Sequence, residues 1–149
     1  MPPSFPSWLR IKVLPVSTRT AADAAVALGV ELGRIAKSLI FYSVTTDNPV
    51  LIIASGANRV DKEKVGEYLG FKIKTAGPDY VLEITSYPVG GVPPFNHKKP
   101  IRTLIDKDLL QYDEIWAAAG TPDSLFSISP KKLVKLTNAE VIIIKDNGS

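Results

Sequence analysis

The chain has 149 residues, of which 45% are hydrophobic and 22% are charged, a composition typical of one globular domain. It contains no cysteine and a single histidine, His97, which excludes disulfides, thiolate nucleophiles and Cys/His zinc sites. The net charge is +3, and residues 1–75 carry ten basic against six acidic groups. This mild excess is compatible with a small anionic ligand such as an RNA end, and it is well below that of a DNA-binding arm.

No stretch of the sequence is apolar enough to cross a membrane, because a spanning helix needs about 18 consecutive apolar residues. Residues 1–8 contain prolines where a signal peptide needs a continuous apolar segment. We therefore expect a cytoplasmic protein that contacts neither membrane nor DNA. The expected organisation is a single domain over residues 1–149, with residues 1–17 as an N-terminal extension.

Helix boundaries are marked by capping residues along the chain. Thr20 stands three residues ahead of Asp23, which is close to the capping-box pattern, and Gly29 follows the alanine-rich stretch between them. Asp61 and Ser129 are further N-cap candidates. The expected helices, including one short helical turn at 106–111, cover residues 20–29, 61–70, 79–86, 106–111 and 129–136.

Runs of β-branched and aromatic residues between these helices predict strands. The expected strands cover residues 35–44, 50–55, 71–75, 101–105, 114–119, 125–128 and 140–145. Residues 46–49 form a turn that joins the first two strands as a hairpin. Because hairpins occur among alternating helices and strands, the sequence predicts a single α/β (α+β) domain with a mixed sheet flanked by short helices.

The least regular segment is the loop at residues 87–97, which contains Gly-Gly-Val-Pro-Pro at residues 90–94. Glycines permit unusual backbone angles and prolines fix φ, so this combination makes a stiff turn. Its amides can point at an oxyanion or at an ester oxygen. A purely structural loop is the alternative, because loops rich in glycine and proline are common and only some bind ligands.

Lys37 interrupts an otherwise apolar strand, and alternation places it on the face of Ile35 and Leu39. One interpretation is a lysine whose stem lies along the apolar surface while its ammonium reaches water. The other is a cation that points into a cleft to meet a phosphate or a carboxylate.

The remaining polar groups carry weaker signals. We expect His97 to lie in a polar, solvated loop, because its neighbours are Asn96, Lys98 and Lys99, and we do not expect it to be a general base. We interpret three aspartates as helix caps and surface charge, namely Asp106, Asp108 and Asp113. No pair of carboxylates indicates a metal site or general acid–base catalysis. A basic rim is a further hypothesis, formed by Arg59, Lys62, Lys64, Lys72, Lys74, Lys98, Lys99 and Arg102.

Several segments, in their order and spacing, resemble the YbaK/prolyl-tRNA synthetase editing-domain family over about residues 18–145. The segments that carry the resemblance are residues 20–30, 35–39, 60–64, 90–94 and 109–120. The resemblance implies a free-standing aminoacyl-tRNA deacylase with a curved mixed sheet. It would hydrolyse a small amino acid, such as alanine or cysteine, wrongly esterified to the terminal adenosine of tRNA-Pro.

The resemblance also implies which residues form the site. Gly90 and Pro94 match the family's G-x-x-x-P loop, whose backbone amides hold the aminoacyl carbonyl, and Lys37 matches its lysine near the terminal nucleotide. The expected catalytic residues are Lys37, Gly90, Gly91 and Pro94, and the expected substrate-binding residues are Val92, Pro93, Phe95, Asn96 and Gly120. Lys98, Lys99 and Arg59 are expected to contact RNA. No cofactor or metal is expected, and the expected partners are the acceptor end of aminoacyl-tRNA and an aminoacyl-tRNA synthetase.

The sequence departs from many relatives at Pro93, where they carry serine, at Asn96, where they carry glycine, and at residues 121–124. Asparagine tolerates a left-handed backbone, so the departure at Asn96 is compatible with the same loop. Two other functions remain as alternatives, a non-catalytic module that binds an RNA end or a nucleotide, and a domain that binds a protein partner.

Overall fold

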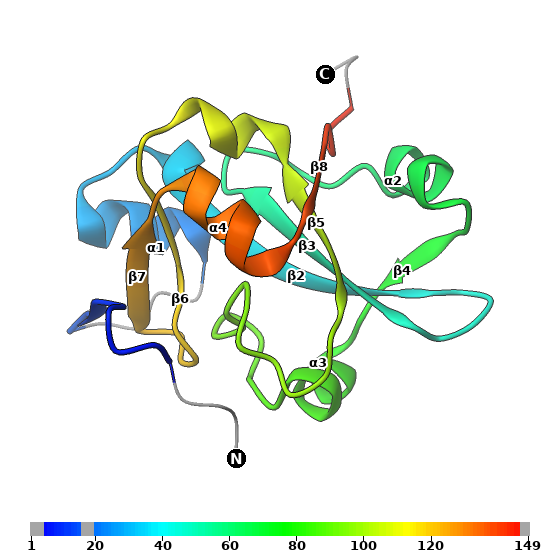
Figure 1. Ribbon diagram of the computed structural model, residues 1–149, viewed down its shortest axis with the longest axis horizontal. Helices are drawn as coiled ribbons and strands as arrows, with labels where there is room; N and C mark the ends of the chain where they lie inside the picture. Colours follow the sequence, from blue (N-terminus) through cyan, green and yellow to red (C-terminus); the bar gives the residue numbers. More distant parts are fainter. Residues whose placement is uncertain (1–4, 16–19, 147–149) are drawn as a thin grey trace.

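One mixed sheet of eight strands organises the described part of the chain (Figure 1). The computed structural model describes residues 5–15 and 20–146. The strands are β1 (Ile11–Val13), β2 (Ile35–Ser43), β3 (Pro49–Ser55), β4 (Ile73–Thr75), β5 (Arg102–Asp106), β6 (Ile115–Ala118), β7 (Ser124–Ile128) and β8 (Glu140–Ile142). They follow the order β1-β7-β6-β2-β3-β5-β8, and β4 pairs with β2. The pairs β2/β6, β3/β5 and β5/β8 are parallel and the others antiparallel, which confirms the predicted mixed sheet.

Capping residues begin α1 (Ala21–Leu28), α2 (Lys62–Leu69) and α4 (Pro130–Thr137) where the sequence predicts them, whereas α3 (Pro78–Thr85) begins without a side-chain cap. The 3₁₀ helices are η1 (Leu32–Arg34) and η2 (Lys107–Gln111). The Thr20 hydroxyl accepts a hydrogen bond from the Asp23 N–H at 3.1 Å, and Asp61 and Ser129 cap α2 and α4 in the same way. Each cap satisfies an N–H that the helix itself leaves unpaired.

The core lies on both faces of the sheet. Leu51 and Ile53 of β3 face one cluster and Ile52 and Ala54 face the other, and each of these side chains is 0% exposed. α3 and α4 cover the first face, and α1 and α2 cover the second. A strand covered on both sides explains the almost unbroken apolar run of β3.

The structure differs from the prediction at the two edges of the sheet. β1 was not predicted, because three residues next to a proline-rich segment are too short to show a strand pattern. Its side chains are all exposed, but it pairs with β7 and places Ile11 opposite Phe126. Some residues of the expected N-terminal extension therefore belong to the sheet. β8 ends at Ile142 instead of residue 145, because the Ile144 carbonyl leaves the sheet and accepts a hydrogen bond from the Asp61 N–H at 2.8 Å.

The segment between α3 and β5 contains no helix or strand, as the sequence predicts. In Figure 1 this loop turns back from α3 toward the middle of the sheet. It is tied to the end of β6, because the Gly120 N–H donates to the Gly91 carbonyl at 2.9 Å. Within the described residues, no helix has the length and apolar character needed to span a membrane.

Candidate active site

The candidate site is a cavity of about 990 Å³ beside β2. Its walls come from α1, from β2, from the segment at residues 56–60, from the loop after α3 and from β6. Its lining includes Lys37, Ser38, Asn58, Arg59, Gly90 and Val92. The volume is in the upper part of the range found for small-molecule sites, so the cavity can enclose most of an aminoacyl nucleoside.

The cavity exists because the sheet is incomplete along one edge of β2. β6 pairs with β2 only at Ile35 and Ala36, and β4 pairs with it only from Phe41 to Ser43. Residues 37–40 therefore have β3 on one side and no strand on the other. An open sheet edge presents backbone donors and acceptors to whatever enters it.

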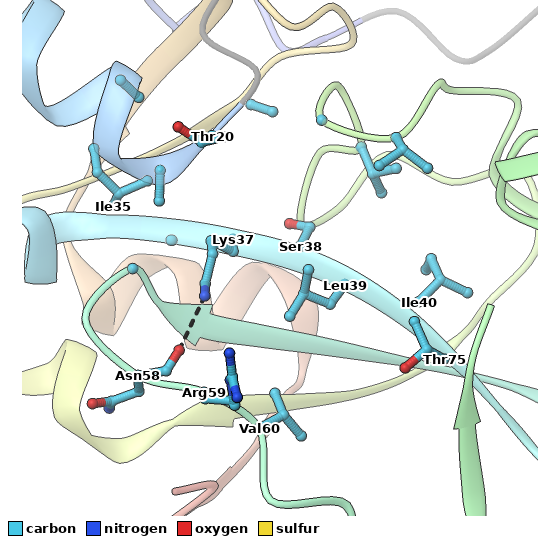
Figure 2. Close-up of a pocket in the computed structure, with 18 of the residues that line it drawn as sticks. Thr20, Ile35, Lys37, Ser38, Leu39, Ile40, Asn58, Arg59, Val60 and Thr75 are labelled. Atoms are coloured by element: carbon cyan, nitrogen blue, oxygen red, sulfur yellow. Dashed lines mark hydrogen bonds between the residues drawn. The ribbon is translucent and has the colours of Figure 1, made fainter. Parts of the chain in front are cut away.

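Lys37 lies on this open stretch and is half-buried. Its ammonium donates to the Asn58 carbonyl at 3.0 Å, and its side chain points from β2 toward the segment that carries Asn58 and Arg59 (Figure 2). Burial lowers the pKa of Lys37, Asp106 opposes this shift, and the positive charge of Arg59 adds to it. Among the described residues this is the one hydrogen bond that Lys37 Nζ makes, so the remaining N–H groups of the ammonium are available to a ligand.

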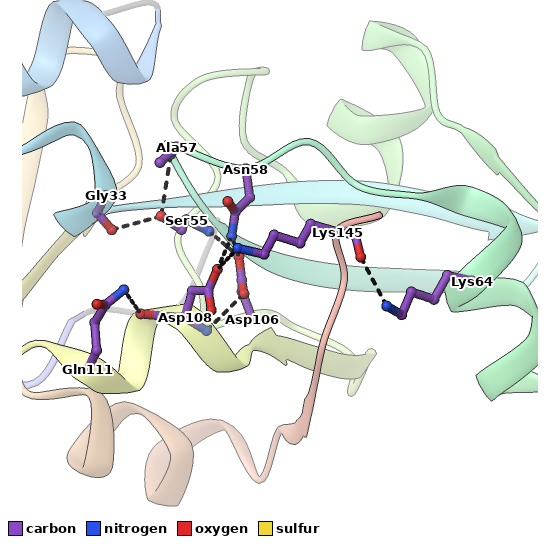
Figure 3. A network of polar contacts seen from close by, with 9 residues as sticks. All are labelled: Gly33, Ser55, Ala57, Asn58, Lys64, Asp106, Asp108, Gln111 and Lys145. Atoms are coloured by element: carbon purple, nitrogen blue, oxygen red, sulfur yellow. Dashed lines mark hydrogen bonds and ion pairs between the residues drawn. The ribbon is translucent and has the colours of Figure 1, made fainter. Parts of the chain in front are cut away.

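Asn58, whose carbonyl accepts the hydrogen bond from Lys37, is held by a polar network that was not predicted from the sequence (Figure 3). The Asn58 amide donates to Asp106 at 2.9 Å and to Asp108 at 2.8 Å. Asp106 is 1% exposed and also accepts from the Ser55 N–H at 3.0 Å, and Lys145 pairs with Asp108 at 2.9 Å. The pKa of Asp108 is lowered by the hydrogen bond from Asn58, which has the larger effect, and by the hydrogen bond from Lys145.

These contacts correct the interpretation of two aspartates as only caps and surface charge. Asp106 does cap η2, because its other oxygen accepts from the Asp108 N–H at 2.9 Å. It also fixes Asn58, and through the Asn58 carbonyl it fixes Lys37. A useful signal in the sequence is an aspartate at the end of a buried strand, because a carboxylate there must find donors in the fold.

The glycine loop reaches the same cavity. Gly90 has φ +88° and lines the cavity together with Val92. Neither the Gly90 N–H nor the Val92 N–H makes a hydrogen bond with another described residue. Two residues of the loop whose amides lack an internal partner thus line the same cavity as Lys37. The prediction that Lys37 and residues 90–94 share a cleft holds for Gly90 and Val92, whereas Gly91, Pro93 and Pro94 are not in the lining.

Gly91 has a structural reason to lack a side chain. A Cβ there would stand 2.9 Å from the Gly120 carbonyl oxygen, and the Gly91 carbonyl accepts the hydrogen bond from Gly120. Gly91 and Gly120 therefore pack backbone against backbone beside the cavity and are not part of its lining. Their contact holds the loop against the end of β6.

The second half of the loop packs into the core instead of lining the cavity. Pro93 and Pro94 are buried, and the ring of Phe95 lies edge-on to Phe126 with 5.6 Å between centroids. Asn96 has φ +75°, the left-handed conformation expected for it. The expected substrate-binding residues Pro93, Phe95 and Asn96, and the expected catalytic Pro94, are thus not among the residues that line the cavity.

His97 is half-buried, whereas its polar neighbours predicted a solvated position. Its Nε2 lies 2.8 Å from the Pro93 carbonyl, and its ring meets Tyr87 edge-on with 6.0 Å between centroids. Burial lowers the pKa of His97, and the hydrogen bond to Pro93 partly opposes this shift. His97 is not among the residues that line the cavity.

The expected RNA-contacting residues lie in different places. Arg59 is exposed and lines the cavity, with Lys62 beside it, whereas Lys98 and Lys99 are exposed outside the lining. The Arg102 guanidinium forms an ion pair with the Glu140 carboxylate at 2.9 Å. The rim of the cavity is thus basic near Arg59. Over residues 5–15 and 20–146, no cluster of three or more acidic or histidine side chains could hold a metal ion.

Fold and cavity together define a single-domain protein with a mixed sheet, a lysine and free backbone amides around one pocket. A family model described as "Aminoacyl-tRNA editing domain" matches residues 16–136. The chain belongs to this family, as its resemblance implied, and it is therefore an aminoacyl-tRNA editing enzyme.

Individual relatives agree with this family. The chain is 33% identical to "Uncharacterized protein YwhH" of Bacillus subtilis, over 93% of this chain and 90% of the relative. It is 29% identical to "Putative Cys-tRNA(Pro)/Cys-tRNA(Cys) deacylase EbsC" of Enterococcus faecalis, over 81% and 74%. A solved structure described as "a putative trans-editing enzyme for prolyl tRNA synthetase" has 44% identity and a TM-score of 0.88, over 94% of this chain and 88% of that one.

Proposed function

We propose that this protein hydrolyses the ester between a small amino acid, alanine or cysteine, and the terminal adenosine of tRNA-Pro. One observation carries the proposal: a single cavity brings the Lys37 ammonium and the unpaired amides of Gly90 and Val92 together. The relatives named for Cys-tRNA(Pro) and for prolyl-tRNA synthetase support the choice of tRNA.

The walls of the cavity suit an apolar amino acid side chain. Many of its lining side chains are alanines, namely Ala21, Ala22, Ala24, Ala36, Ala57, Ala76 and Ala118. Synthetases reject small apolar side chains poorly, because a missing or added methylene changes the binding free energy by only about 1–3 kcal/mol. A separate enzyme that removes such residues is the usual remedy.

The amides of Gly90 and Val92 are proposed to bind the ester carbonyl oxygen. Water adds to the carbonyl carbon, negative charge develops on that oxygen, and the bond to the ribose oxygen then breaks. The ribose hydroxyl leaves with a proton, and the free amino acid is the other product. A preorganised backbone donor contributes about 3–4 kcal/mol to such a step, which is substantial for an ester that is already activated.

Lys37 is proposed to hold the terminal nucleotide by charge. Its position is set by the Asn58 carbonyl, so the ammonium is held before the substrate arrives. The lining residues that the structure describes include no histidine and no carboxylate that could act as a general base, and we assign activation of water to the ribose hydroxyl of the substrate.

The other expected residues are proposed to act around this centre. Gly91 and Gly120 hold the loop, and Pro93, Pro94, Phe95 and Asn96 stiffen it from the core side. Arg59, Lys98 and Lys99 are proposed to contact the acceptor stem. The protein is proposed to work in the cytoplasm, where aminoacyl-tRNA is made, with a synthetase as a candidate partner.

A panel of labelled aminoacyl-tRNAs tests the proposal. Ala-tRNA-Pro and Cys-tRNA-Pro should release free amino acid, whereas Pro-tRNA-Pro should remain intact. Lys37→Ala should remove most of this activity, and Lys131→Ala, which changes an exposed lysine of α4, should not. Binding without release would instead indicate a module for RNA ends, and neither binding nor release would indicate a domain that binds a protein.

A further inference from the structure

Backbone groups of Ser38 are left without partners by the way β2 is paired. The Gly56 N–H donates to the Ile35 carbonyl at 2.7 Å, and the Ser43 N–H donates to the Asn48 carbonyl at 2.9 Å. In an antiparallel pair, hydrogen-bonded residues alternate along each strand. Residues 35, 37 and 39 therefore direct their N–H and C=O toward β3, and residues 36, 38 and 40 direct theirs toward the opposite edge.

On that opposite edge, Ser38 lies between two strands and pairs with neither. β6 pairs with Ala36. The Ile40 carbonyl accepts a hydrogen bond at 3.1 Å from the N–H of Ala76, the residue that follows β4. No strand register of the described residues includes Ser38 on this side, and Ser38 lines the cavity. Its hydroxyl is buried and also has no hydrogen-bond partner. Polar groups left unpaired inside a fold are costly, so a ligand that pairs with them gains affinity.

The chemical pattern of these groups matches an aminoacyl ester. A residue in a strand offers one N–H and one C=O on the same side, and it pairs with a residue that offers the same two groups. The α-ammonium and the carbonyl of an aminoacyl ester flank one α-carbon, so they offer this same pair. The ester can therefore fill the gap as a strand that is one residue long.

We propose that Ser38 binds the aminoacyl group in this way, its C=O accepting from the α-ammonium and its N–H donating to the ester carbonyl. The inference rests on the proposed function and adds recognition of the amino acid. The oxyanion that develops from this carbonyl has three lone pairs, so the Ser38 N–H acts on it together with the proposed donors Gly90 and Val92. Ser38 thereby becomes a backbone donor at the reacting carbonyl.

The pairing also fixes where the side chain of the amino acid lies. Residues paired in an antiparallel ladder put their side chains on the same face. An L-amino acid would therefore place its side chain on the face of Ser38, which is opposite to Lys37 (Figure 2). The cavity wall on that face includes Val81 and Val92, which leaves apolar space for a small group. A D-amino acid would place its side chain on the face of Lys37.

Substrate analogues test the proposal without any change to the protein. Propionyl-tRNA-Pro lacks the amino group of Ala-tRNA-Pro and keeps the same tRNA and the same chain length. Each enzymatic rate is divided by the uncatalysed rate of the same ester, because an α-ammonium also activates the ester in water. We expect the normalised rate to fall about ten- to hundredfold for the propionyl ester, as for loss of a hydrogen bond to a charged group.

Equal normalised rates for the two esters, with Ala-tRNA-Pro readily cleaved, would overturn the role of Ser38 and leave the proposed function intact. If Ala-tRNA-Pro is not cleaved at all, the proposed function fails and this inference fails with it. Amide hydrogen exchange supplies a second readout that does not depend on turnover. The non-hydrolysable 3′-alanylamido-3′-deoxyadenosine should slow exchange of the Ser38 N–H at least tenfold, whereas the propionylamido analogue should have a much smaller effect. No slowing at saturating alanyl analogue would contradict the pairing.

Discussion

Removing the Asn58 amide should weaken both the fold and the site. In Asn58→Ala the carboxylates of Asp106 and Asp108 each lose one hydrogen bond, of 2.9 and 2.8 Å. A hydrogen bond to a charged group contributes about 1.5–3 kcal/mol when it is buried. Asp106 is 1% exposed, whereas the Asp108 side chain is 35% exposed, so we count the first bond nearly in full and the second only slightly.

The expected loss of stability is therefore about 2 kcal/mol. For a domain of this size it corresponds to a decrease in Tm of roughly 4–8 °C. The Asn58 carbonyl remains in the variant but is no longer anchored, so Lys37 should lose its fixed position. We expect kcat/KM for deacylation to fall roughly ten- to hundredfold, as for a small misplacement of a binding group.

Thermal unfolding and single-turnover kinetics on the same preparations measure both effects. Gln111→Ala is the matched control, because its amide donates to the Asp108 backbone carbonyl at 2.9 Å from an exposed position. It should change stability by about 0.5 kcal/mol or less. A Tm and a rate for Asn58→Ala that both equal those of this control would refute the role of the network.

The pH dependence of stability adds a check with a definite sign. Asn58 and Lys145 lower the pKa of Asp108 below its ordinary value of 3.8. The stabilisation that arises from Asp108 is therefore fully present above about pH 3.8 and is lost as the pH falls through the lowered pKa. The difference in stability between wild type and Asn58→Ala should thus narrow below pH 3.8. If this difference in stability stays constant until the protein unfolds in acid, Asp108 contributes nothing to the destabilisation of Asn58→Ala.

Three further substitutions separate chemistry from folding. Lys37→Arg keeps the charge but replaces a compact ammonium by a planar fork, so the rate should fall roughly tenfold or more at unchanged Tm; a rate equal to wild type would contradict a fitted site. His97→Ala should lower Tm and leave the rate per folded molecule unchanged, and loss of most activity would indicate a general base. EDTA should leave the deacylation rate unchanged, and loss of most activity would indicate a metal. Gly90→Ala should reduce turnover about ten- to thousandfold, because a Cβ at φ +88° reorients an oxyanion donor. Normal turnover per folded molecule would make the loop purely structural.

Local signals in the sequence predicted most of the elements, because capping and turn chemistry act over a few residues. Thr20, Asp61 and Ser129 each begin a helix as their side chains require, and the hydrogen bonds are present. The family resemblance also related Lys37 to the glycine loop, and two residues of that loop, Gly90 and Val92, line the cavity with Lys37. The spacing of residues alone did not decide between a structural and a functional role for Lys37 or for the loop.

Features that depend on distant segments could not be read in the same way. Residues 35–43 look like one continuous strand, and nothing in their alternation indicates that the neighbours on one edge stop at Ala36 and begin again near Ile40. The Asn58 network joins residues about fifty positions apart, so its geometry exists only after β3 and β5 have paired. Sequence periodicity reports which face is buried, and not which edge is open.

The open edge has a consequence for the proposed mechanism, which uses neither a histidine nor a metal. A backbone amide does not change its charge with pH, and it needs no reorientation during the reaction when the fold holds it in place. Here the fold holds such groups from two directions, Gly90 through the contact of its loop with Gly120, and Ser38 through its place between β6 and β4. In the proposed mechanism Lys37 adds its positive charge between them, and its hydrogen bond to the Asn58 carbonyl holds it at the cavity. Because the proposed donors belong to the backbone, we expect the alanines and valines around them to select the substrate side chain. Changes among these residues should therefore alter which amino acid is removed while the deacylation chemistry itself persists.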